Sequence, residues 1–585
     1  MTALDEILGP LDEDQRRIAE TLRGPVSVLA GAGTGKTRTI THRIAYGVRS
    51  GVYAPDRVLA VTFTRKAAAE LQGRLRGLGA GEVRAQTFHG AALAQLGYFW
   101  PLVVGGPAPQ LLGGGKLPVI AQAAESLGLS LRTETLRDIA AEIEWRKVSM
   151  MGLEGYARLL GAGSESQGNS GDSAAGKRET SARPVPAGVT AAQLIGIQEV
   201  YGRLLEERRQ IDFEDVLILT AGMLETEPRA AVQVRERYRF FTVDEYQDVS
   251  PLQHALLSLW LGDRNDVCVV GDASQTIYSF AGAKSSYLLR FTAEHPGARE
   301  FRLERNYRST EPIVRVANRL MRDRPGALTL QAVRSSESRG SAPDPAFEWF
   351  ASEQDEAEAV AASIGASIEA GLPARDIAVL YRTNAQSAAI EAALDARGIP
   401  ARVHGAQRYF DRAEVRQAVV LMRAQAKVED KRPLFQIVSD VLRACGWESR
   451  PPEGAAARER WQALNAILAL VDDLPADTTA QAFSEELSAR SHAHHEPALD
   501  AVTLSAVHSA KGLEWALVHL IGMSEGLLPI AYADDREALE EERRLAYVAF
   551  TRARNELRVS GSAGGARSRR APSRFVEEAG LLIAR

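Results

Sequence analysis

The sequence has few cysteines and no long apolar run, and each scarcity excludes a class of protein. Two cysteines among 585 residues cannot form a disulfide framework or a four-cysteine zinc site. Low cysteine content suits a reducing cytoplasm. The longest apolar stretches, such as 515–523, are far shorter than the ~20 residues that span a bilayer, and the acidic first residues do not resemble a secretory signal. We therefore expect a cytoplasmic protein with no membrane partner.

An excess of basic charge is also lacking. Lysine and arginine total 70 and aspartate and glutamate 75, which gives a net charge of −5. This balance argues against a protein that coats nucleic acid through bulk charge, although a local basic groove stays compatible with it. The apolar share of 45% and the charged share of 25% are near the globular average. Disordered, collagen-like and coiled-coil chains are thereby excluded, and the length suits about four domains.

Short apolar runs alternate with longer helical patterns, in two sets. Runs that are apolar throughout are typical of strands buried on both faces, and hence of parallel sheets covered by helices. The sequence therefore predicts an α/β protein with two parallel-sheet domains. Its strands are expected at 26–30, 58–63, 240–244 and 267–271, and at 377–381, 502–507, 517–521 and 557–559.

Mostly helical segments interrupt both sets. The segment 161–188 is rich in glycine, serine, alanine and proline, and is predicted to be a mobile loop or linker. Residues 560–573 are expected to form a loop before a short final helix. The predicted division is 1–105 and 206–296 for the first α/β domain, 106–205 for its helical insertion, 297–415 and 500–585 for the second α/β domain, and 416–499 for a smaller helical insertion.

A glycine-rich segment, Ala30-Gly31-Ala32-Gly33-Thr34-Gly35-Lys36-Thr37, follows the first predicted strand and precedes an amphipathic helix. Glycines let backbone N–H groups converge on phosphate oxygens, and the helix N-terminus adds a positive dipole end. Lys36 can reach the β- and γ-phosphates, and Thr37 can hold Mg²⁺. Ala30 replaces the glycine of the strict pattern. The strand–loop–helix context disfavours the alternative of a chance glycine-rich turn.

The run Phe240-Phe241-Thr242-Val243-Asp244-Glu245 is the natural second half of such a site. A buried strand would deliver Asp244 to Mg²⁺, and Glu245 would polarise a water for attack on the γ-phosphate. Alone, an Asp-Glu pair at a strand end is often a solvated turn. Together with the glycine-rich loop it predicts a nucleoside triphosphatase.

Further motifs carry a resemblance to a known family. They are Asp244-Glu245-Tyr246-Gln247-Asp248, Gly271-Asp272-Ala273-Ser274-Gln275, Leu303-Glu304-Arg305-Asn306-Tyr307-Arg308-Ser309, Val507-His508-Ser509-Ala510-Lys511-Gly512-Leu513-Glu514 and Tyr547-Val548-Ala549-Phe550-Thr551-Arg552-Ala553. In this order, from Gln15 to Arg552, the chain resembles the superfamily 1A DNA helicases of the UvrD/PcrA/Rep family. The resemblance implies two RecA-like motor domains, each with a mostly helical insertion, and ATP hydrolysed between the motors.

The resemblance also assigns roles at an ATP site. Gln15 would read adenine, Tyr307 would stack on the base, and Glu514 would bind the ribose. Gln275 would sense the γ-phosphate, and Arg308 and Arg552 would reach it as arginine fingers, which can be worth ~10³–10⁵ in rate. The remaining nucleotide contacts implied are Gly31, Ala32, Gly33, Thr34, Gly35, Lys36, Thr37 and Arg38.

A single strand of nucleic acid is held by stacked aromatics and a polar groove. Taken singly, Phe63 or Phe88 would more often be a core residue, and only their place in matching motifs favours a surface role. The residues implied to contact DNA are Phe63, Thr87, Phe88, His89, Tyr278, Phe280, Arg382, Asn384 and His508.

Two departures from the family pattern bear on activity. Tyr278-Ser279-Phe280-Ala281 stands where the family usually has Tyr-Arg-Trp-Arg, which should weaken the grip on DNA. The insertion 416–499 is also smaller than usual. Translocation is therefore a safer expectation than processive unwinding by a monomer.

The sequence thus predicts an ATP-dependent, Mg²⁺-requiring translocase on single-stranded DNA and a 3′→5′ helicase in DNA repair or replication. Expected partners are single-stranded DNA, 3′-tailed duplex DNA and repair proteins, with the protein a monomer or a DNA-induced dimer at the bacterial nucleoid. One alternative is a translocase that strips proteins from DNA with weak unwinding. Others are a non-hydrolysing DNA-binding module, and a motor on RNA, although no residue visibly reads a 2′-OH.

Overall fold

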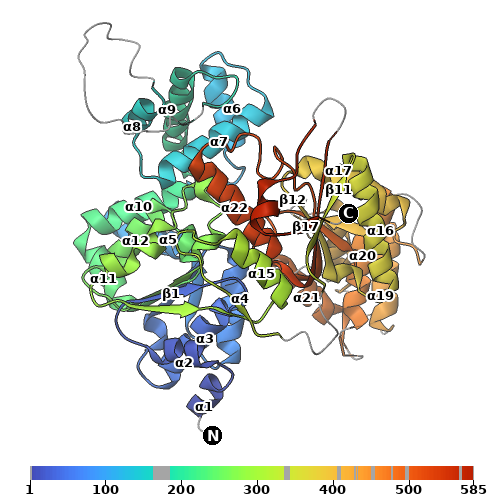
Figure 1. Cartoon of the computed structure of the whole chain (residues 1–585). Coiled ribbons are helices and arrows are strands. Elements are labelled where there is room, and N and C mark those ends of the chain that lie inside the picture. Colours follow the sequence, from blue (N-terminus) through green and yellow to red (C-terminus); the bar gives the residue numbers. More distant parts are fainter. Residues whose placement is uncertain are drawn as a thin grey trace, which may run out of the picture. The chain divides into compact units, whose positions relative to one another are not determined.

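The chain folds into two compact units in a computed structural model (Figure 1). One comprises Met1–Ala30 and Lys36–Leu303, and the other comprises Gly31–Gly35 and Glu304–Arg585. The structure describes residues 3–161, 183, 185–334, 343–404, 410, 412–426, 430, 432–449, 455–472, 474–475, 478–493, 500–564 and 569–583. The predicted linker therefore lies, at 162–182 and 184, outside the described residues. No helix in the described ranges has the length and apolar character needed to cross a membrane.

The first unit is built on a parallel sheet, as predicted. The strand order is β3-β2-β6-β7-β1-β8. Every residue of the four central strands is buried. The sheet consists of β1 (Val26–Ala30), β2 (Val58–Thr62), β3 (Arg84–Thr87), β6 (Phe240–Val243), β7 (Val267–Gly271) and β8 (Arg299–Leu303).

The two edge strands of this sheet were not predicted from the sequence. β3 has no buried residue, and β8 buries only Leu303. Both edge strands are therefore more polar than the central strands. They lack the continuous apolar run from which the central strands were predicted. β8 pairs in parallel with β1. Residues 299–303 thus belong to the first sheet, whereas the division drawn from the sequence placed them in the second domain.

The segment 106–205 contains four helices among its described residues, with a hydrophobic core of their own that includes Ile139, Tyr156 and Ile197. The four helices gather at one end of the first unit (Figure 1). They are α6 (Leu117–Ser126), α7 (Thr133–Val148), α8 (Leu153–Leu159) and α9 (Ala191–Glu207).

The second unit is built on another parallel sheet, also as predicted, in the order β13-β14-β12-β15-β16-β11-β17. The loop expected from residue 560 was wrong at its start, because β16 is ten residues long and ends at Ser562. The short final helix is confirmed as α23 (Arg574–Glu578). The strands are β11 (Ala346–Phe350), β12 (Ile377–Tyr381), β13 (Ala401–Val403), β14 (Val502–Ala506), β15 (Trp515–Leu520), β16 (Ala553–Ser562) and β17 (Leu582–Ile583).

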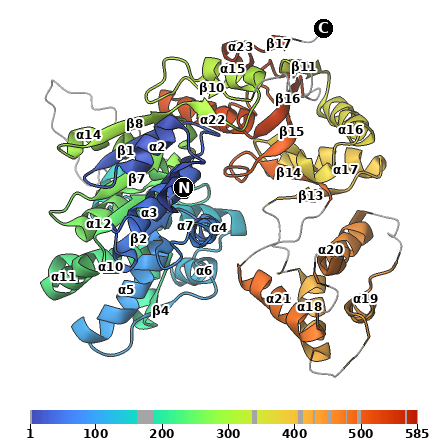
Figure 2. The same cartoon turned by 90° about the horizontal axis from the view of Figure 1, so that it is seen from below.

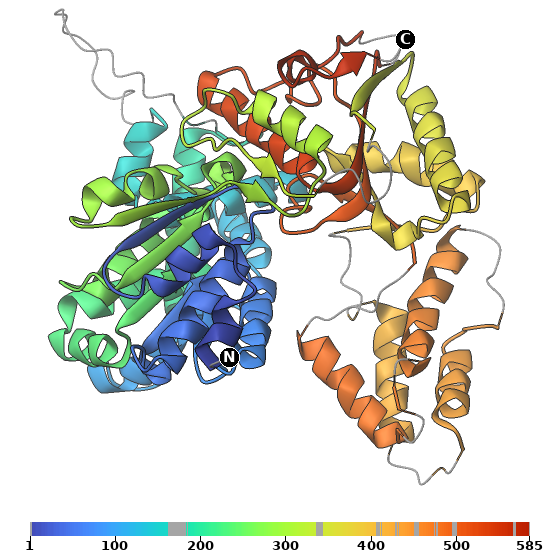
Figure 3. The same ribbon diagram turned by 60° about the horizontal axis from the view of Figure 1, so that its bottom comes forward.

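Within 413–493 a group of helices packs around its own apolar core, which includes Met422, Leu442, Leu464 and Phe483. The group is seen together in Figures 2 and 3. It consists of α18 (Ala413–Gln425), α19 (Leu434–Ala444), α20 (Ala455–Asp472) and α21 (Ala480–Ala493).

Candidate nucleotide and nucleic-acid sites

The end of the glycine-rich loop meets the end of β6 in the first unit. Lys36 and Thr37 open α3 (Lys36–Arg49). The Thr37 hydroxyl lies 3.5 Å from Oδ2 of Asp244, and Nζ of Lys36 lies 3.9 Å from Oε1 of Glu245. Because β1, β7 and β6 are neighbours in a parallel sheet, their carboxyl ends share one edge. The structure therefore brings these four predicted residues together.

The donor set at this edge fits Mg²⁺. Mg²⁺ takes oxygen ligands, and usually binds one or two protein oxygens together with water and substrate phosphates. Thr37 and Asp244 offer a hydroxyl and a carboxylate of that kind. Burial, and next the carboxylate of Glu245, raise the pKa of Asp244 to about 7. A carboxyl that ionises reluctantly is stabilised in its charged form by a cation beside it.

Glu245 is held in an uncommon backbone conformation. Its φ is +54°, in the left-handed region that non-glycine residues rarely adopt. Its N–H donates to Oδ1 of Asp244 at 3.0 Å, and its side chain accepts from Nε2 of Gln247. Such strain persists where the surroundings fix it, and is found at active sites. The carboxylate is thereby pointed toward Lys36.

Gln275 is linked to this cluster through Gln247. The Asp272 N–H donates to Oε1 of Gln247 at 3.0 Å, and Nε2 of Gln275 donates to Oδ2 of Asp272 at 2.7 Å. A Cβ on Gly271 would collide with Oε1 of Gln247, so only glycine allows this approach. Gln247 had no role in the sequence prediction. Its position two residues after Glu245 is the sequence feature that could have identified it.

Gln15 and Arg38 lie in the same unit. Gln15 is buried in α2 (Glu13–Glu20), where it forms a capping box with Asp12: its N–H donates to Oδ1 of Asp12 at 2.8 Å, and its Oε1 accepts from the Asp12 N–H at 3.3 Å. Arg38 donates to the carbonyl of Pro10 at 2.6 Å. The first turn of α3 is therefore joined to the segment that leads into α2, which fixes the approach of Gln15.

In the second unit, Arg308, Glu514 and Arg552 lie together. Nε of Arg308 is 2.5 Å from Oε2 of Glu514. Arg552 is 1% exposed and donates to the carbonyls of Val548 and Leu513 at 3.0 and 3.1 Å. The two arginines thus contact the same Leu513–Glu514 segment.

The glycines of the loop contact the motif that contains Tyr307. The Tyr307 N–H donates to the Gly33 carbonyl at 2.9 Å, and Nδ2 of Asn306 donates to the Ala32 carbonyl at 2.7 Å. Tyr307 is 37% exposed. Gly33 has a φ of +70° and no room for a Cβ beside Asn306.

An exposed aromatic surface lies at the carboxyl end of β2. The rings of Phe63 and Tyr278 stack with centroids 5.5 Å apart and planes 17° apart. Phe280 meets Tyr278 edge to face at 6.2 Å. Phe63 is 41% exposed and Phe280 58%, and exposed rings of this kind stack on successive bases of a single strand.

The three predicted residues after β3 divide between surface and core. Thr87 caps α5 (Phe88–Val103) by accepting from the Gly90 N–H. Phe88 is 3% exposed and stacks on Trp260 in the core. It is therefore not part of the exposed aromatic set.

His89 stacks on Phe213, with centroids 4.0 Å apart, and Phe213 is 41% exposed. Burial, and then Lys116, lower the pKa of His89 to about 4, so the ring is neutral near pH 7. Phe213 is not among the residues predicted to contact DNA. Nothing in its local pattern distinguishes it from Phe88, because exposure depends on the tertiary fold.

Phe213 is fixed by ion pairs at the start of α10 (Phe213–Thr226). Asp212 caps this helix. Nζ of Lys147, from α7, lies 2.7 Å from both Asp212 and Asp215, and Tyr201 donates to Asp212 at 3.0 Å. The helical insertion therefore holds in place the aromatic residue next to His89.

The second unit places Arg382, Asn384 and His508 near the ends of β12 and β14. Arg382 makes a two-pronged ion pair with Glu542, with N–O distances of 2.8–3.0 Å. Asn384 is exposed. Burial, and then Arg382, lower the pKa of His508 to about 4. This trio offers one amide at the surface and one guanidinium that is already paired.

Comparison with known proteins gives concordant matches. The family described as UvrD/REP helicase N-terminal domain matches residues 11–296, and the UvrD-like helicase C-terminal domain matches 301–451 and 453–563. The chain is 44% identical over 596 residues to the ATP-dependent DNA helicase UvrD2 of Mycobacterium tuberculosis (strain ATCC 25618 / H37Rv), which covers 98% of this chain and 82% of the relative. It is 29% identical over 664 residues to DNA helicase II of Escherichia coli (strain K12), covering 98% and 88%.

Proposed function

Because the chain belongs to the UvrD/REP helicase family, we propose that it is an ATP-dependent DNA helicase that moves along single-stranded DNA in the 3′→5′ direction. The observation that carries the proposal is the cluster of Lys36, Thr37, Asp244 and Glu245 at one sheet edge. The same unit carries the exposed rings of Phe63 and Phe280, which meet the half-buried ring of Tyr278.

ATP hydrolysis would use the residues of this cluster as follows. The loop N–H groups and Lys36 hold the phosphates of ATP. Glu245 accepts a proton from the attacking water. Gln275 reports the γ-phosphate to the Asp272–Gln247–Glu245 chain of hydrogen bonds. Mg²⁺, held by Thr37 and Asp244, would neutralise charge on the β- and γ-phosphates.

The second unit carries further residues that we propose to contact the nucleotide. Tyr307 stacks on adenine, whose edge Gln15 reads with Arg38 nearby, and Glu514 binds the ribose. Arg308 and Arg552 stabilise the charge that develops on the γ-phosphate. Arg308 would then exchange the Glu514 carboxylate for a phosphate, and arginine makes strong, often bidentate, pairs with both groups. ATP would then change the ion pairing of the second unit.

Single-stranded DNA would lie on aromatic and polar groups of both units. The bases stack on exposed rings, and the backbone meets Thr87, His89, Asn384, Arg382 and His508. The expected substrates are single-stranded DNA and 3′-tailed duplexes, in DNA repair or replication with repair-protein partners. The protein would work at the nucleoid in the cytoplasm, as a monomer or a DNA-induced dimer.

A second candidate function is a translocase that strips proteins from single-stranded DNA and unwinds weakly. It is favoured by Ser279 and Ala281, which supply no guanidinium beside the exposed Phe280. Single-strand binding without these charges provides fewer phosphate contacts to resist the strain of duplex separation.

The test compares strand displacement on 3′-tailed and 5′-tailed duplexes with ATPase activity on single strands. The proposed function expects DNA-stimulated ATPase activity and displacement only from the 3′ tail. Lys36→Ala should abolish both, while Arg49→Ala, at the other end of α3, should leave both intact. ATPase activity without displacement from either tail would favour the stripping translocase. Hydrolysis by Lys36→Ala at the wild-type rate would refute the site.

A further inference from the structure

Asn306 is a fully buried amide beside the phosphate-binding loop. Its exposed fraction is 0%. It lies in β9 (Arg305–Asn306), which pairs in parallel with β10 (Gln331–Ala332). Unlike its neighbours Tyr307 and Arg308, Asn306 has neither an aromatic ring nor a charge. The sequence analysis gave it no role.

Both ends of the Asn306 side chain are engaged, and with different parts of the chain. Its Nδ2 donates to the Ala32 carbonyl at 2.7 Å. Its Oδ1 accepts from the N–H groups of Arg308 and Ser309 at 2.9 and 2.7 Å. One amide therefore ties the glycine-rich loop to the backbone turn that carries Arg308.

The loop side of this link has no slack. A Cβ on Gly33 would lie 2.7 Å from Nδ2 of Asn306 and 2.7 Å from Cβ of Arg308. A shift of the Gly33 region must therefore move these side chains with it, because packed groups transmit displacement.

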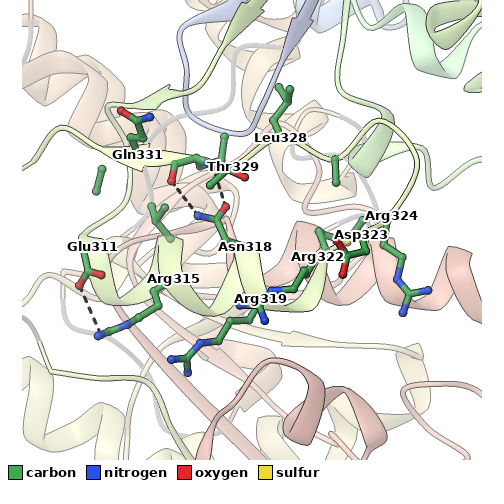
Figure 4. Close-up of a pocket in the computed structure, with 15 residues that line it drawn as sticks. Glu311, Arg315, Asn318, Arg319, Arg322, Asp323, Arg324, Leu328, Thr329 and Gln331 are labelled. Carbon is green, nitrogen blue, oxygen red and sulfur yellow. Dashed lines mark hydrogen bonds and ion pairs between the residues drawn. The ribbon is translucent and has the colours of Figure 1, made fainter.

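The other side of Asn306 is supported by α15 (Glu311–Leu320). A pocket of about 610 Å³ lies along this helix and the chain that leads into β10. Asn318, on α15, donates to the Leu330 carbonyl at 2.8 Å and accepts from the Leu330 N–H at 2.9 Å (Figure 4). β10 is thereby fixed to α15, and β9 to β10, so that Asn306 rests on a rigid base.

We propose that Asn306 is a positioning residue that couples the phosphate-binding loop to Arg308. Nδ2 of Asn306 holds the Ala32 carbonyl of the loop, and Oδ1 holds the N–H groups of Arg308 and Ser309, so the position of the loop sets the position of the Arg308 backbone. The inference rests on the proposed ATPase function. It adds to that function a residue, Asn306, through which Arg308 would respond to the nucleotide.

Two substitutions separate the loop link from the turn. Asn306→Ala removes both ends of the amide. Asn306→Asp keeps an acceptor for the Arg308 and Ser309 N–H groups but places an oxygen against the Ala32 carbonyl, where no hydrogen bond can form. If Asn306 couples the loop to Arg308, both variants should lower kcat about 10²-fold, because misplacing a reacting group costs about that much in rate. The KM for ATP should change by less than about threefold in Asn306→Ala. Retention of kcat by Asn306→Asp would overturn the proposal, since the turn alone would then account for Asn306.

A double-mutant cycle gives the decisive readout. If Asn306 acts through Arg308, then Asn306→Ala in an Arg308→Ala background slows hydrolysis by less than about threefold further, because coupled effects are not additive. A full additional 10²-fold loss would overturn the proposal. The same cycle with Asn306→Asp tests whether its added charge acts independently of Arg308.

A half-buried amide in another part of the chain controls for the loss of an amide side chain as such. Asn465 accepts from Nε1 of Trp447 at 3.2 Å in the α18–α21 helix group. Asn465→Ala should leave kcat unchanged, and thermal unfolding should show Asn306→Ala folded at the assay temperature. If the wild-type chain itself shows no ATPase activity, the proposed function fails. If the wild type is active and the cycle is additive, only the coupling fails.

Discussion

The two parallel sheets present their candidate residues in different settings. In the first unit, Thr37, Asp244, Glu245 and Gln275 form one network, and the aromatic rings beside it are open to solvent. In the second unit, two of the candidate arginines are already paired with carboxylates, Arg308 with Glu514 and Arg382 with Glu542. The third, Arg552, donates to backbone carbonyls. The two settings therefore differ: the candidate residues of the first unit bond to one another, whereas Arg308 and Arg382 of the second unit each already have an ionic partner.

Within the second unit the two ion pairs themselves differ. The side chains of Arg308 and Glu514 are 18% and 41% exposed, and those of Arg382 and Glu542 are 13% and 4% exposed. An exposed pair contributes little to stability and is exchanged easily, while a buried pair is costly to break. Arg308 is therefore suited to respond to a nucleotide, and Arg382 to hold a fixed shape.

The largest effect is expected when Arg308, the candidate arginine finger of the second unit, is replaced. Arg308→Ala should lower the kcat of DNA-stimulated ATP hydrolysis by about 10³-fold or more, because an arginine finger is worth ~10³–10⁵. Steady-state assays with saturating single-stranded DNA measure it. Arg315→Ala, one turn into α15 and paired with Glu311 at 3.5 Å, is the control and should stay within about twofold of wild type. A loss below tenfold in Arg308→Ala would mean that the second unit does not supply this charge.

The next effect sharpens the contrast between the two ion pairs. Glu542→Gln leaves Arg382 buried without its counter-charge and should lower the free energy of unfolding by about 3–5 kcal/mol. Glu514→Gln should change it by less than about 1 kcal/mol, since that pair is partly solvated. Denaturant unfolding, followed by a probe in the second unit, compares them. Equal losses in the two variants would remove the distinction between a fixed and an exchangeable arginine.

Much of this arrangement could be predicted from the sequence, for identifiable physical reasons. The runs that became β1 and β7 are apolar throughout because both faces of a central parallel strand are buried. The edge strands β3 and β8 face solvent, so their mixed composition carried no such signal. The proximity of Lys36 and Asp244 was expected from the glycine-rich loop that opens a helix and from the buried strand that ends before Asp244. Positions that depend on tertiary packing could not be predicted from the sequence. Examples are Phe88 in the core, Phe213 at the surface, and Asn306 between two backbone segments.

Phe63 and Phe88 allow the distinction between surface and core to be tested. Phe63→Ala should weaken single-stranded DNA binding by about 1–3 kcal/mol, the worth of one base stack, with little change in stability. Phe88→Ala should instead destabilise the first unit by about 3–5 kcal/mol through a core cavity. Fluorescence anisotropy with a labelled oligonucleotide and thermal unfolding measure the two effects. Weaker binding without destabilisation in Phe88→Ala would place that ring on the DNA surface.

The smallest expected effect concerns an ionisable group inside the second sheet. His519, on β15, is 3% exposed, and its Nε2 has no hydrogen-bond partner among the described residues. Burial, and then Arg558, lower its pKa to about 3. An unfolded histidine has a pKa near ~6.5, so between these values the unfolded chain binds the extra proton. Acidification therefore favours unfolding.

For His519 alone, the free energy of unfolding should fall by about 1 kcal/mol between pH 7 and pH 5.5. His519→Leu puts an apolar side chain of similar size in the strand and removes the proton-binding group. The wild type should thus lose about 1 kcal/mol more than His519→Leu over this range, measured by denaturant unfolding at each pH with a probe in the second unit. His89 and His508 titrate in the same direction but are present in both proteins, so they cancel in the difference. Parallel pH profiles for the two proteins would mean that His519 has the same pKa in the folded and the unfolded chain, and that burial in the second sheet does not disfavour its charged form.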